Sequence, residues 1–427
     1  MSTLDTTLRL AKKVIPRSVF RALQPTYHRG LAFASSLAHR FPSRAIKVIV
    51  ITGTKGKTST TEIINAILEE AGYTTAVLGT LRFKIADDNR PNMYKMSVPG
   101  RFFVQKFLRE AVDAGCQVAV LEMTSEGAKQ FRHKGIDMDT LVFTNLSPEH
   151  IESHGSFEKY KQAKLSIAKA LSESHKRPRT IIANNDDPHG DSFLAVHADI
   201  KLPYSLMDVN IIEETESKST FMYDGQRFCI HLPGRFNIYN CLAGLTLAHS
   251  LNIETAVSKR ALEKLSQIRG RLERIEEGQN FSVIVDYAHT ADSLEKVYNV
   301  YRGARKIAVL GGTGGGRDIE KRKIMGSIAE EHCEHIILTN EDPYDEDPNK
   351  IIDDVALGIK YKQPIKILDR REAIVKAFSL ASPGDVVIIT GKGTDPYIME
   401  AGGKKTPWDD ATVAREELQS YLHNKKN

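Results

Sequence analysis

The chain has 427 residues, 41% of them hydrophobic, which is enough for two or three domains with buried cores. No apolar run approaches the roughly 20 residues needed to cross a bilayer, and no charged stretch followed by an apolar one marks a signal peptide. Four widely separated cysteines form no Cys-x-x-Cys pair, which favours small core residues over metal ligands or disulfides. We therefore expect a cytoplasmic protein.

The net charge of +5 is unevenly distributed along the chain. Residues 1–47 hold nine Lys or Arg and one acid, Asp5, a local charge of +8 that leaves about −3 for the rest. Because the basic excess is local, we expect no nucleic-acid partner for the main body. Prolines 16, 25 and 42 predict that this N-terminal arm forms short helices. It either packs on the main domain or offers a basic surface to an anionic or membrane-linked substrate.

Residues 47–58 predict a phosphate-binding loop between a strand and a helix. The β-branched run Val48 to Ile51 indicates a buried strand, which breaks at Gly53, and Gly56-Lys57-Thr58 opens a helical stretch. Backbone N–H groups and the helix N-terminus attract an anion, a lysine reaches the outer phosphates, and a hydroxyl holds Mg²⁺. The alternative is an ordinary strand-to-helix turn, but strand, glycines, lysine, hydroxyl and helix all coincide here.

From residue 48 to about 269, predicted strands and helices alternate, which favours a mostly parallel sheet. The expected strands cover 75–78, 118–121, 140–143 and 180–183, and a helix covers 157–171. Ligands bind at the carboxyl ends of such strands, where Glu122, Asn145 and Asn184 lie. An Asp-Gly pair at 224–225 predicts a β-hairpin, and 234–240 opens a helix. A second α/β unit starts near Arg271, with strands at 282–285, 306–310, 335–338, 365–368 and 386–389.

In these residues the chain resembles the Mur ligase family, and within it the branch that adds the third amino acid of the peptidoglycan stem. The resemblance covers about residues 46–420. Its motifs are Thr-Gly-Thr-Lys-Gly-Lys-Thr at 52–58, Leu-Glu-Met-Thr-Ser-Glu at 121–126, Phe-Thr-Asn-Leu-Ser-Pro-Glu-His at 143–150, Gly-Arg-Phe-Asn-Ile-Tyr-Asn at 234–240, Gly-Arg-Leu-Glu at 270–273, Asp-Tyr-Ala-His-Thr at 286–290 and Gly-Lys-Gly at 391–393.

The resemblance, together with the basic N-terminal stretch, predicts an α/β fold with three parts. These are a short, basic helical N-terminal arm (1–47), a central P-loop ATPase domain with a mostly parallel sheet (48–269) and a Rossmann-like C-terminal domain that binds the amino acid (270–427). It also implies ATP-driven amide formation through an acyl phosphate, with Mg²⁺ and a UDP-N-acetylmuramoyl dipeptide as acceptor. We expect a monomer with small-molecule substrates. A ligase acting on a folate or a polypeptide, and a non-catalytic homologue, are the alternatives.

The same resemblance assigns the candidate site residues. Those with a catalytic role would be Lys57, His150, Lys164 and Arg271. The nucleotide would contact Gly53, Thr54, Lys55, Gly56, Lys57, Thr58, Ser59, Asn237, Asn240, Arg271, Asp286 and His289. Metal ligands would be Thr58, Glu122, His150 and Lys164. Lys164 resembles a lysine that family members carbamoylate, although Lys161 lies on the same helical face and chemistry alone does not choose between them. The substrates would contact Ser97, Ser125, Asp342, Tyr344, Gly391 and Asp395.

The chain departs from the family pattern at three places. Family members usually carry a UDP-binding domain of about a hundred residues before the ATP loop, and here only 47 residues precede it. Glu126 stands where a His is usual. The diaminopimelate enzymes carry Asp-Asn-Pro-Arg where this chain has Glu-Asp-Pro-Tyr at 341–344, among further acids at 345–347. Tyr344 cannot form a bidentate pair with a carboxylate, so we expect a diamino acid without a distal carboxylate.

Overall fold

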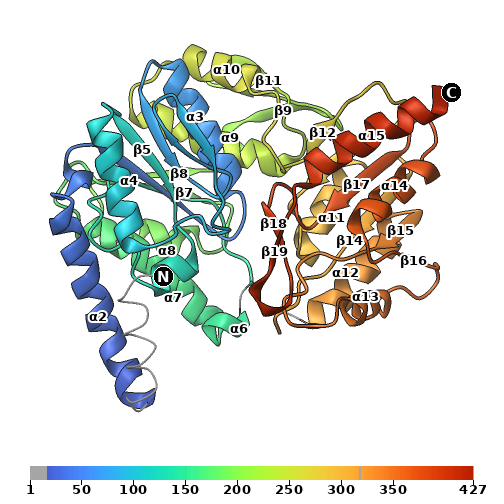
Figure 1. Cartoon of the computed structure of the whole chain (residues 1–427). Helices are drawn as coiled ribbons and strands as arrows, with labels where there is room; N and C mark the ends of the chain where they lie inside the picture. Colours follow the sequence, from blue (N-terminus) through green and yellow to red (C-terminus); the bar gives the residue numbers. More distant parts are fainter. Residues whose placement is uncertain (1–16, 150, 317–318, 427) are drawn as a thin grey trace.

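The computed structural model describes residues 17–149, 151–316 and 319–426. Two α/β domains lie side by side, and the hairpin of β18 (Tyr397–Met399) and β19 (Lys405–Pro407) lies between them (Figure 1). The first domain is built on an eight-stranded sheet in the order β4-β3-β2-β5-β1-β6-β7-β8. Its strands are β1 (Lys47–Thr52), β2 (Thr75–Leu78), β3 (Arg82–Ile85), β4 (Asp88–Pro91), β5 (Val118–Glu122), β6 (Thr140–Phe143), β7 (Thr180–Asn184) and β8 (Ile200–Tyr204).

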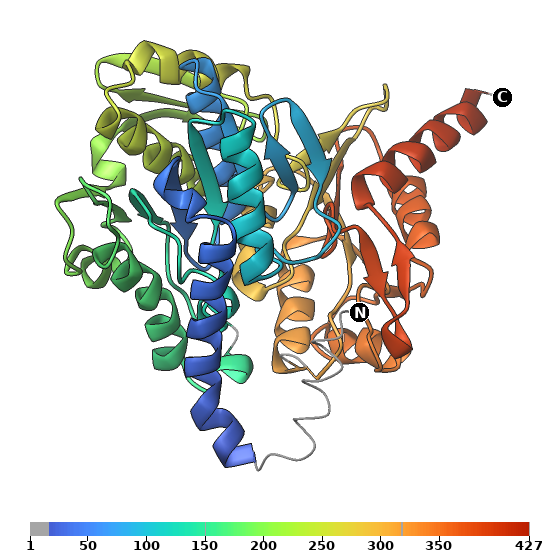
Figure 2. The same ribbon diagram turned by 60° about the vertical axis from the view of Figure 1, so that its left-hand side comes forward.

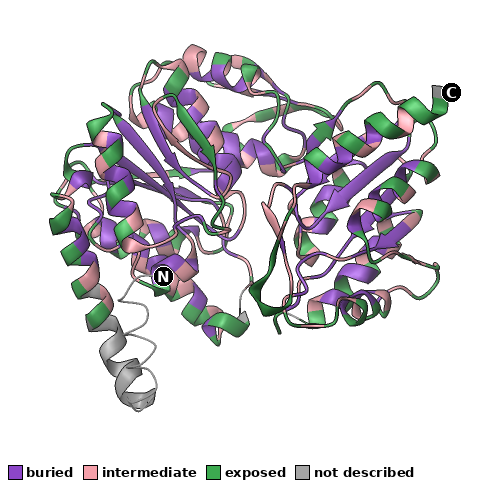
Figure 3. Ribbon diagram, in the orientation of Figure 1, coloured by how far each residue is buried: buried purple, intermediate pink, exposed green. Residues whose placement is uncertain are grey.

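The six strands from β2 to β8 in this order pair in parallel, and β3 and β4 add an antiparallel edge. Every residue of β5, β6 and β7 is buried. Figure 3 shows these strands as the buried interior of the domain. Parallel sheets are covered by helices on both faces, which explains why these strands are continuous apolar runs rather than alternating ones.

Alternate residues of β1 face opposite helical layers. Val48 and Val50 belong to the core beneath α4 (Arg101–Asp113) and α7 (Phe157–Ser172). Ile49 and Ile51 belong to the core beneath α3 (Lys57–Glu70) and α9 (Arg235–Ser250). Because side chains of a strand alternate between its faces, one short segment anchors both layers. This anchoring fixes the position of the loop that follows β1.

A small antiparallel sheet, β9 (Asn210–Glu214), β10 (Ser219–Tyr223) and β11 (Gln226–Ile230), follows the large one. The turn between β10 and β11 is Asp224-Gly225, both with positive φ (48° and 70°), so the predicted hairpin is confirmed. The remaining helices of this domain are short or peripheral: α5 (Ser125–Lys129), α6 (Ile151–His154), α8 (Gly190–Leu194) and α10 (Thr255–Lys264), with 3₁₀ turns at 42–44 and 206–208.

The second domain has a six-stranded sheet in the order β12-β13-β17-β14-β15-β16. Its strands are β12 (Glu273–Ile275), β13 (Ser282–Asp286), β14 (Lys306–Leu310), β15 (His335–Leu338), β16 (Ile365–Lys366) and β17 (Val386–Thr390), and only β12 pairs antiparallel. One face packs on α11 (Ala291–Val300), α12 (Ile319–His332) and α13 (Pro348–Ala356), and the other on α14 (Arg370–Leu380) and α15 (Asp410–Lys426). The predicted α/β class and the positions of its strands are confirmed.

The N-terminal arm differs from the prediction in one respect. Helix α2 (Arg17–Ala38) continues through Pro25, so the expected break there is wrong. A proline removes a single backbone N–H, and the turns on either side of it hold the helix together. The helix runs along the outside of α4 (Figure 2), where Ala32, Ser35 and Ser36 are buried. The prediction that the N-terminal arm packs on the main domain is therefore confirmed for this part of α2. No described helix is long and apolar enough to cross a membrane.

Candidate active site

The loop after β1 requires glycine at two positions. Gly53 and Gly56 have φ of 154° and 79°. A Cβ on Gly53 would lie 1.9 Å from the hydroxyl of Thr144, and one on Gly56 would lie 2.5 Å from Oδ1 of Asn240. The loop is also held from outside, because the amide of Asn145 accepts from the N–H of Lys55 (2.9 Å) and donates to its carbonyl (3.0 Å). The backbone is therefore preorganised as a cradle at the N-terminus of α3.

Two lysines converge inside this cradle. The ammonium of Lys57 donates to the carbonyls of Gly53 (2.9 Å) and Thr54 (2.8 Å), and that of Lys164 donates to the same Gly53 carbonyl at 2.6 Å. Lys164 is 1% exposed. Burial lowers the pKa of both lysines, and neighbouring positive charges lower it further. Arg271 and Lys55 act on Lys57. Lys57 acts in turn on Lys164. Lys161, on the next turn of the same helix, is half-buried and makes no such contact among the bonds that the structure gives.

A chain of hydrogen bonds joins the cradle to the segment around Ser97. Thr58 donates to a carboxylate oxygen of Glu122 (3.1 Å), and the hydroxyl of Thr80 donates to the same oxygen (2.8 Å). Thr80 also lies 2.6 Å from the hydroxyl of Ser97. Glu122 is 1% exposed and accepts a further bond from the N–H of Thr80. Two of the candidate metal ligands, Thr58 and Glu122, and the candidate substrate residue Ser97 are thus parts of one network.

The second domain contributes a cation to the same place. Arg271 extends a guanidinium nitrogen to 3.4 Å from the Thr58 hydroxyl, and its guanidinium carbon lies 4.8 Å from the centre of the Tyr287 ring. Lys55 of the loop forms an ion pair with Asp292 in the first turn of α11. The loop is therefore contacted by both domains in this conformation.

Asn237 and Asn240 lie on the first turns of α9, beside the loop. Asn240 accepts from the hydroxyl of Thr60 (3.2 Å) and donates to Asn237 (3.1 Å), which in turn donates to the carbonyl of Pro233 (2.8 Å). The helix is capped by Gly234 and not by Asn237. Across the domain boundary, buried Asp286 accepts from the N–H groups of Leu272 (2.8 Å) and Ala288 (2.7 Å), and burial raises its pKa.

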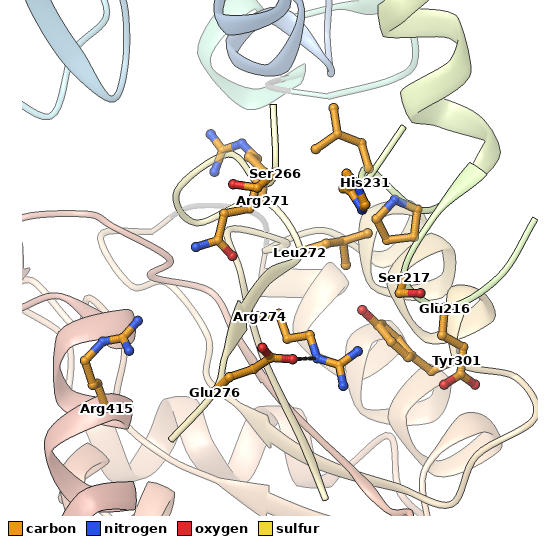
Figure 4. Close-up of a pocket in the computed structure, with 13 residues that line it drawn as sticks. Glu216, Ser217, His231, Ser266, Arg271, Leu272, Arg274, Glu276, Tyr301 and Arg415 are labelled. Atoms are coloured by element: carbon orange, nitrogen blue, oxygen red, sulfur yellow. Dashed lines mark ion pairs between the residues drawn. The ribbon is translucent and has the colours of Figure 1, made fainter. Parts of the chain in front are cut away.

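A cavity of about 490 Å³ opens between these elements (Figure 4). Arg271 is common to this cavity and the cradle, and Pro233 and Leu272, the backbone partners of Asn237 and Asp286, form parts of its wall. Its lining mixes apolar and aromatic surface with charges of both signs: Leu232, Pro233, Leu272 and Tyr301, with Arg271, Arg274, Arg415, Glu216 and Glu276.

The histidines of the site fall into three situations. His150 lies outside the described residues. His289 is held through Nδ1 by the carbonyl of Tyr287 (2.8 Å), its Nε2 lies 3.9 Å from Glu149, and burial lowers its pKa. His154 lies 3.2 Å from both the hydroxyl of Ser125 and a carboxylate oxygen of Glu126. The unusual Glu126 is thus paired with His154, next to the candidate substrate residue Ser125.

The candidate amino-acid pocket contains a four-membered charge cluster. Asp342 and Asp395 share two ammonium groups, those of Lys392 and of Lys95 from the first domain, at 2.7–2.9 Å. Gly391 precedes Lys392 with φ of 106°, and Tyr344 has φ of 53° and donates its N–H to the carbonyl of Met399.

The acids flanking this cluster do not form a bare negative pocket. Asp345 accepts from the N–H of Gly402, Glu346 pairs with Arg322, and Asp347 caps α13. Glu341 is buried, accepts from Thr313, and keeps Oε2 without a hydrogen bond.

Sequence reasoning missed Thr80 and Lys95 as members of the site, whereas Lys392 belongs to the Gly-Lys-Gly motif at 391–393. Thr80 follows the carboxyl end of β2, so the rule that identified Glu122 at the end of β5 would also have identified it. Lys95 offers no such signal, because it reaches the second domain from an irregular loop.

Strand, phosphate loop and interdomain cation together define the class of protein: an ATP-using enzyme whose site is completed by a second domain. Two family descriptions match the chain, "Mur ligase middle domain" over residues 51–248 and "Mur ligase, glutamate ligase domain" over 270–393. The chain belongs to the Mur ligase family, and so to the ATP-dependent ligases that form amide bonds in the synthesis of peptidoglycan precursors.

Individual relatives agree with this assignment. The chain is 36% identical to a UDP-N-acetylmuramyl-tripeptide synthetase of Roseiflexus sp., over 92% of this chain and 82% of that protein. It is 36% identical to a UDP-N-acetylmuramoyl-L-alanyl-D-glutamate–2,6-diaminopimelate ligase of Bacillus licheniformis, over 91% and 82%. A solved structure of such a diaminopimelate ligase matches with a TM-score of 0.60 and 29% identity, over 88% of this chain and 79% of that one.

Proposed function

We propose that the chain uses ATP to join an amino acid to the free carboxylate of a UDP-N-acetylmuramoyl dipeptide. The observation that carries this proposal is the meeting of Thr58, Glu122 and Arg271, from the phosphate loop, a strand end and the second domain. It brings a phosphate cradle, a carboxylate and an interdomain cation into contact, which is what phosphoryl transfer requires. The domain boundary is proposed between residues 269 and 270.

The nucleotide is proposed to bind across the domain boundary. The triphosphate lies on the backbone of residues 53–59, and the base and ribose extend toward the cavity beside Arg271. Asn237 and Asp286 support this orientation, because each fixes the backbone of a residue in the cavity wall. Asn240 and His289 lie on the two sides of the boundary and are proposed to close on the nucleotide.

Mg²⁺ is proposed to bind at Thr58 and Glu122. Their oxygens lie 3.1 Å apart, and one carboxylate with one hydroxyl leaves room for the phosphate oxygens and water that Mg²⁺ keeps as ligands. The described residues contain no cluster of three His, Cys, Asp or Glu side chains that could hold a metal. A site completed by the nucleotide fits this donor set better than an all-protein site. His150 is proposed for a second Mg²⁺.

Lys164 is proposed to be carbamoylated. Its nitrogen attacks CO₂ as a neutral amine, an N–C bond forms, and a proton leaves to give a carbamate anion. Burial beside Lys57 lowers the lysine pKa and so supplies the neutral amine. The product exchanges repulsion between two ammonium groups for attraction between an anion and Lys57. It also creates an oxygen ligand for Mg²⁺ where only a cation stood.

The catalytic steps use the residues in this arrangement. Bound ATP and Mg²⁺ supply the γ-phosphate and positive charge on its oxygens. Lys57 leaves the Gly53 and Thr54 carbonyls for the γ-phosphate, and Arg271 approaches from the second domain. The acceptor carboxylate, held near Ser97 and Ser125, bonds to the γ-phosphorus as ADP leaves. The amine then bonds to the acyl carbon and phosphate leaves. Both steps depend on positioning and fixed cations.

The amino acid is proposed to bind at Asp342, Tyr344, Gly391 and Asp395, and to lack a distal carboxylate. Lys392 does not replace the missing arginine, because Asp342, Asp395 and the Tyr397 carbonyl occupy its three N–H groups.

We propose that the enzyme acts as a monomer in the cytoplasm, in keeping with its four free cysteines.

Phosphate release tests the proposed function. The purified protein is assayed with ATP and Mg²⁺ against a panel of acceptors (UDP-N-acetylmuramoyl dipeptide, dihydrofolate and a glutamyl peptide), each with several amino acids. Release that needs both the muramoyl dipeptide and an amino acid is the expected result. Release with a folate or peptide acceptor alone, or with no acceptor, contradicts the proposal. Arg271→Ala serves as a folded comparison with the nucleotide contact removed.

A further inference from the structure

Lys95 of the first domain reaches into the second domain and is held there by carboxylates. Its ammonium lies 2.7 Å from Asp342 and 2.8 Å from Asp395, with the Tyr397 carbonyl at 3.4 Å. The side chain is 16% exposed. Burial alone would lower the pKa of Lys95, but the charges of Asp395 and Asp342 raise it, so the group is a stable cation. The backbone of Lys95 is in the left-handed region, φ 53°, which directs the loop toward this contact.

Among the described residues of this pocket, neither Lys392 nor Lys95 has a spare donor for a carboxylate. Lys392 and Lys95 approach the same three acceptors, Asp342, Asp395 and the Tyr397 carbonyl. An ammonium has three N–H groups, so each lysine is saturated. A ligand carboxylate entering here would have to break one of these pairs and leave a buried charge unpaired. A ligand ammonium can replace an existing ammonium without changing the charge of the cluster.

Of the two lysines, Lys95 is the one that can separate from Asp342 and Asp395. Lys392 belongs to the same domain as its partners, is completely buried, and is fixed by the turn between Gly391 and Gly393. Lys95 comes from the other domain on an irregular loop between β4 and α4. The base of this loop is fixed separately, because Asn92 donates to the carbonyls of Gly79 (2.8 Å) and Met96 (2.9 Å). The tip can therefore move while the base stays.

We propose that Lys95 is a tethered competitor of the amino-acid substrate: in the free enzyme its ammonium occupies the position on Asp342 and Asp395 that a distal substrate ammonium takes. This inference rests on the proposed function, which places the amino acid in this pocket. The exchange of one ammonium for another selects lysine-like substrates and rejects those with an acidic end.

Chemical labelling of lysines tests the occupancy directly. Reductive dimethylation read by mass spectrometry compares Lys95 with the exposed Lys106 as an internal standard, in the free enzyme and with saturating L-lysine or L-norleucine. We expect Lys95 to be protected in the free enzyme and with norleucine, and to become reactive with L-lysine. A reactive Lys95 in the free enzyme, or one that stays protected with L-lysine, overturns the proposal. This measurement needs no turnover, so it decides the question even if the acceptor assignment fails.

Kinetics of Lys95→Gln give the second test. If Lys95 fills the pocket in about nine-tenths of the free enzyme, its removal lowers the KM for the amino acid about tenfold with kcat unchanged. Lys95→Arg keeps a cation that can pair with both aspartates and is expected to keep the high KM. A rise in KM for Lys95→Gln would mean that Lys95 binds the substrate instead of competing with it, which overturns the proposal.

Discussion

Lys57 and Lys164 donate to one acceptor, the carbonyl oxygen of Gly53, at 2.9 and 2.6 Å. Two ammonium groups at a single buried carbonyl repel each other, and the repulsion is relieved when an anion arrives or one lysine loses its charge. A bound phosphate is such an anion, and formation of a carbamate on Lys164 removes the positive charge of that lysine. The same geometry therefore serves the binding of ATP and the modification of Lys164.

Replacing Lys57 should abolish turnover. Lys57→Ala removes the cation that we propose to move onto the γ-phosphate, and loss of such a contact costs about a hundredfold to a thousandfold in kcat. The measurement is phosphate release at saturating ATP, with the fold checked by circular dichroism. Lys159→Ala, a lysine on the solvent side of α7, is the matched control and should keep full activity. Near-normal release by folded Lys57→Ala would remove the assignment of the ATP site.

The unmodified Lys164 should destabilise the fold, so that Lys164→Met gains stability. A lysine with a lowered pKa in the folded state binds fewer protons there than in the unfolded chain. Its cost is therefore full below the folded pKa and is lost as the pH rises toward the ordinary value of about 10.4. Thermal unfolding in CO₂-free buffer at pH 7 should show a gain of about 1 kcal/mol or more for Lys164→Met, shrinking toward pH 10. An unchanged or lower stability would contradict this account.

The modification itself predicts rescue by small carboxylates. Lys164→Ala should lose most activity and recover part of it with added formate or acetate, because these supply the oxygen ligand that the carbamate provides. Lys161→Ala, one turn away on the same helix, is the control and should stay active. Activity of the unmutated enzyme should fall in CO₂-depleted buffer and at lower pH, where carbamate formation is disfavoured. An active Lys164→Ala protein, with the unmodified lysine mass in the wild type, refutes the assignment.

The parts that could be predicted from the sequence are those that depend on local rules. The strand at 48–51, the two glycines and Lys57-Thr58 obey backbone and anion-binding constraints that act within a dozen residues. Glu122 could be located because strand ends in a parallel sheet share one edge. These elements made the first domain recognisable.

The parts that could not be predicted depend on long-range contacts. Lys95 lies 247 residues from Asp342, and no local pattern signals that they meet. The sequence shows five acids within 341–347, but only the fold reveals that each has a structural partner or a buried position. Pro25 was expected to end a helix, yet α2 continues through it from Arg17 to Ala38.

The basic arm should contribute to binding an anionic acceptor or surface. Residues 1–16 lie outside the described part and carry Arg9, Lys12 and Lys13, whereas the arm from Ala32 onward is packed into the fold. Deleting 1–16 alone therefore removes three of the arm's nine cations and keeps the buried residues from Ala32 onward. We expect a higher KM for the acceptor at low salt, weaker binding to anionic vesicles and a smaller salt dependence. Equal KM values for the truncated and complete enzymes at low salt would exclude this role.

The amino acid added should be one with a distal ammonium and no distal carboxylate. We expect Tyr344 to occupy the position where the diaminopimelate enzymes carry an arginine. Lys95 and Lys392 are both paired with Asp342 and Asp395. Binding meso-diaminopimelate would leave its second carboxylate without a bidentate partner, a loss of about 2–3 kcal/mol, or roughly a hundredfold in kcat/KM.

The measurement compares kcat/KM for L-lysine, L-ornithine and meso-diaminopimelate on one muramoyl dipeptide. Tyr344→Arg is the informative variant, because it restores the fork and should shift the ratio toward diaminopimelate, while Tyr344→Phe should leave it unchanged. A clear preference of the unmutated enzyme for diaminopimelate would show that this interpretation of the pocket is wrong. The relatives that carry diaminopimelate in their names make this comparison decisive, since they share about a third of their residues with this chain.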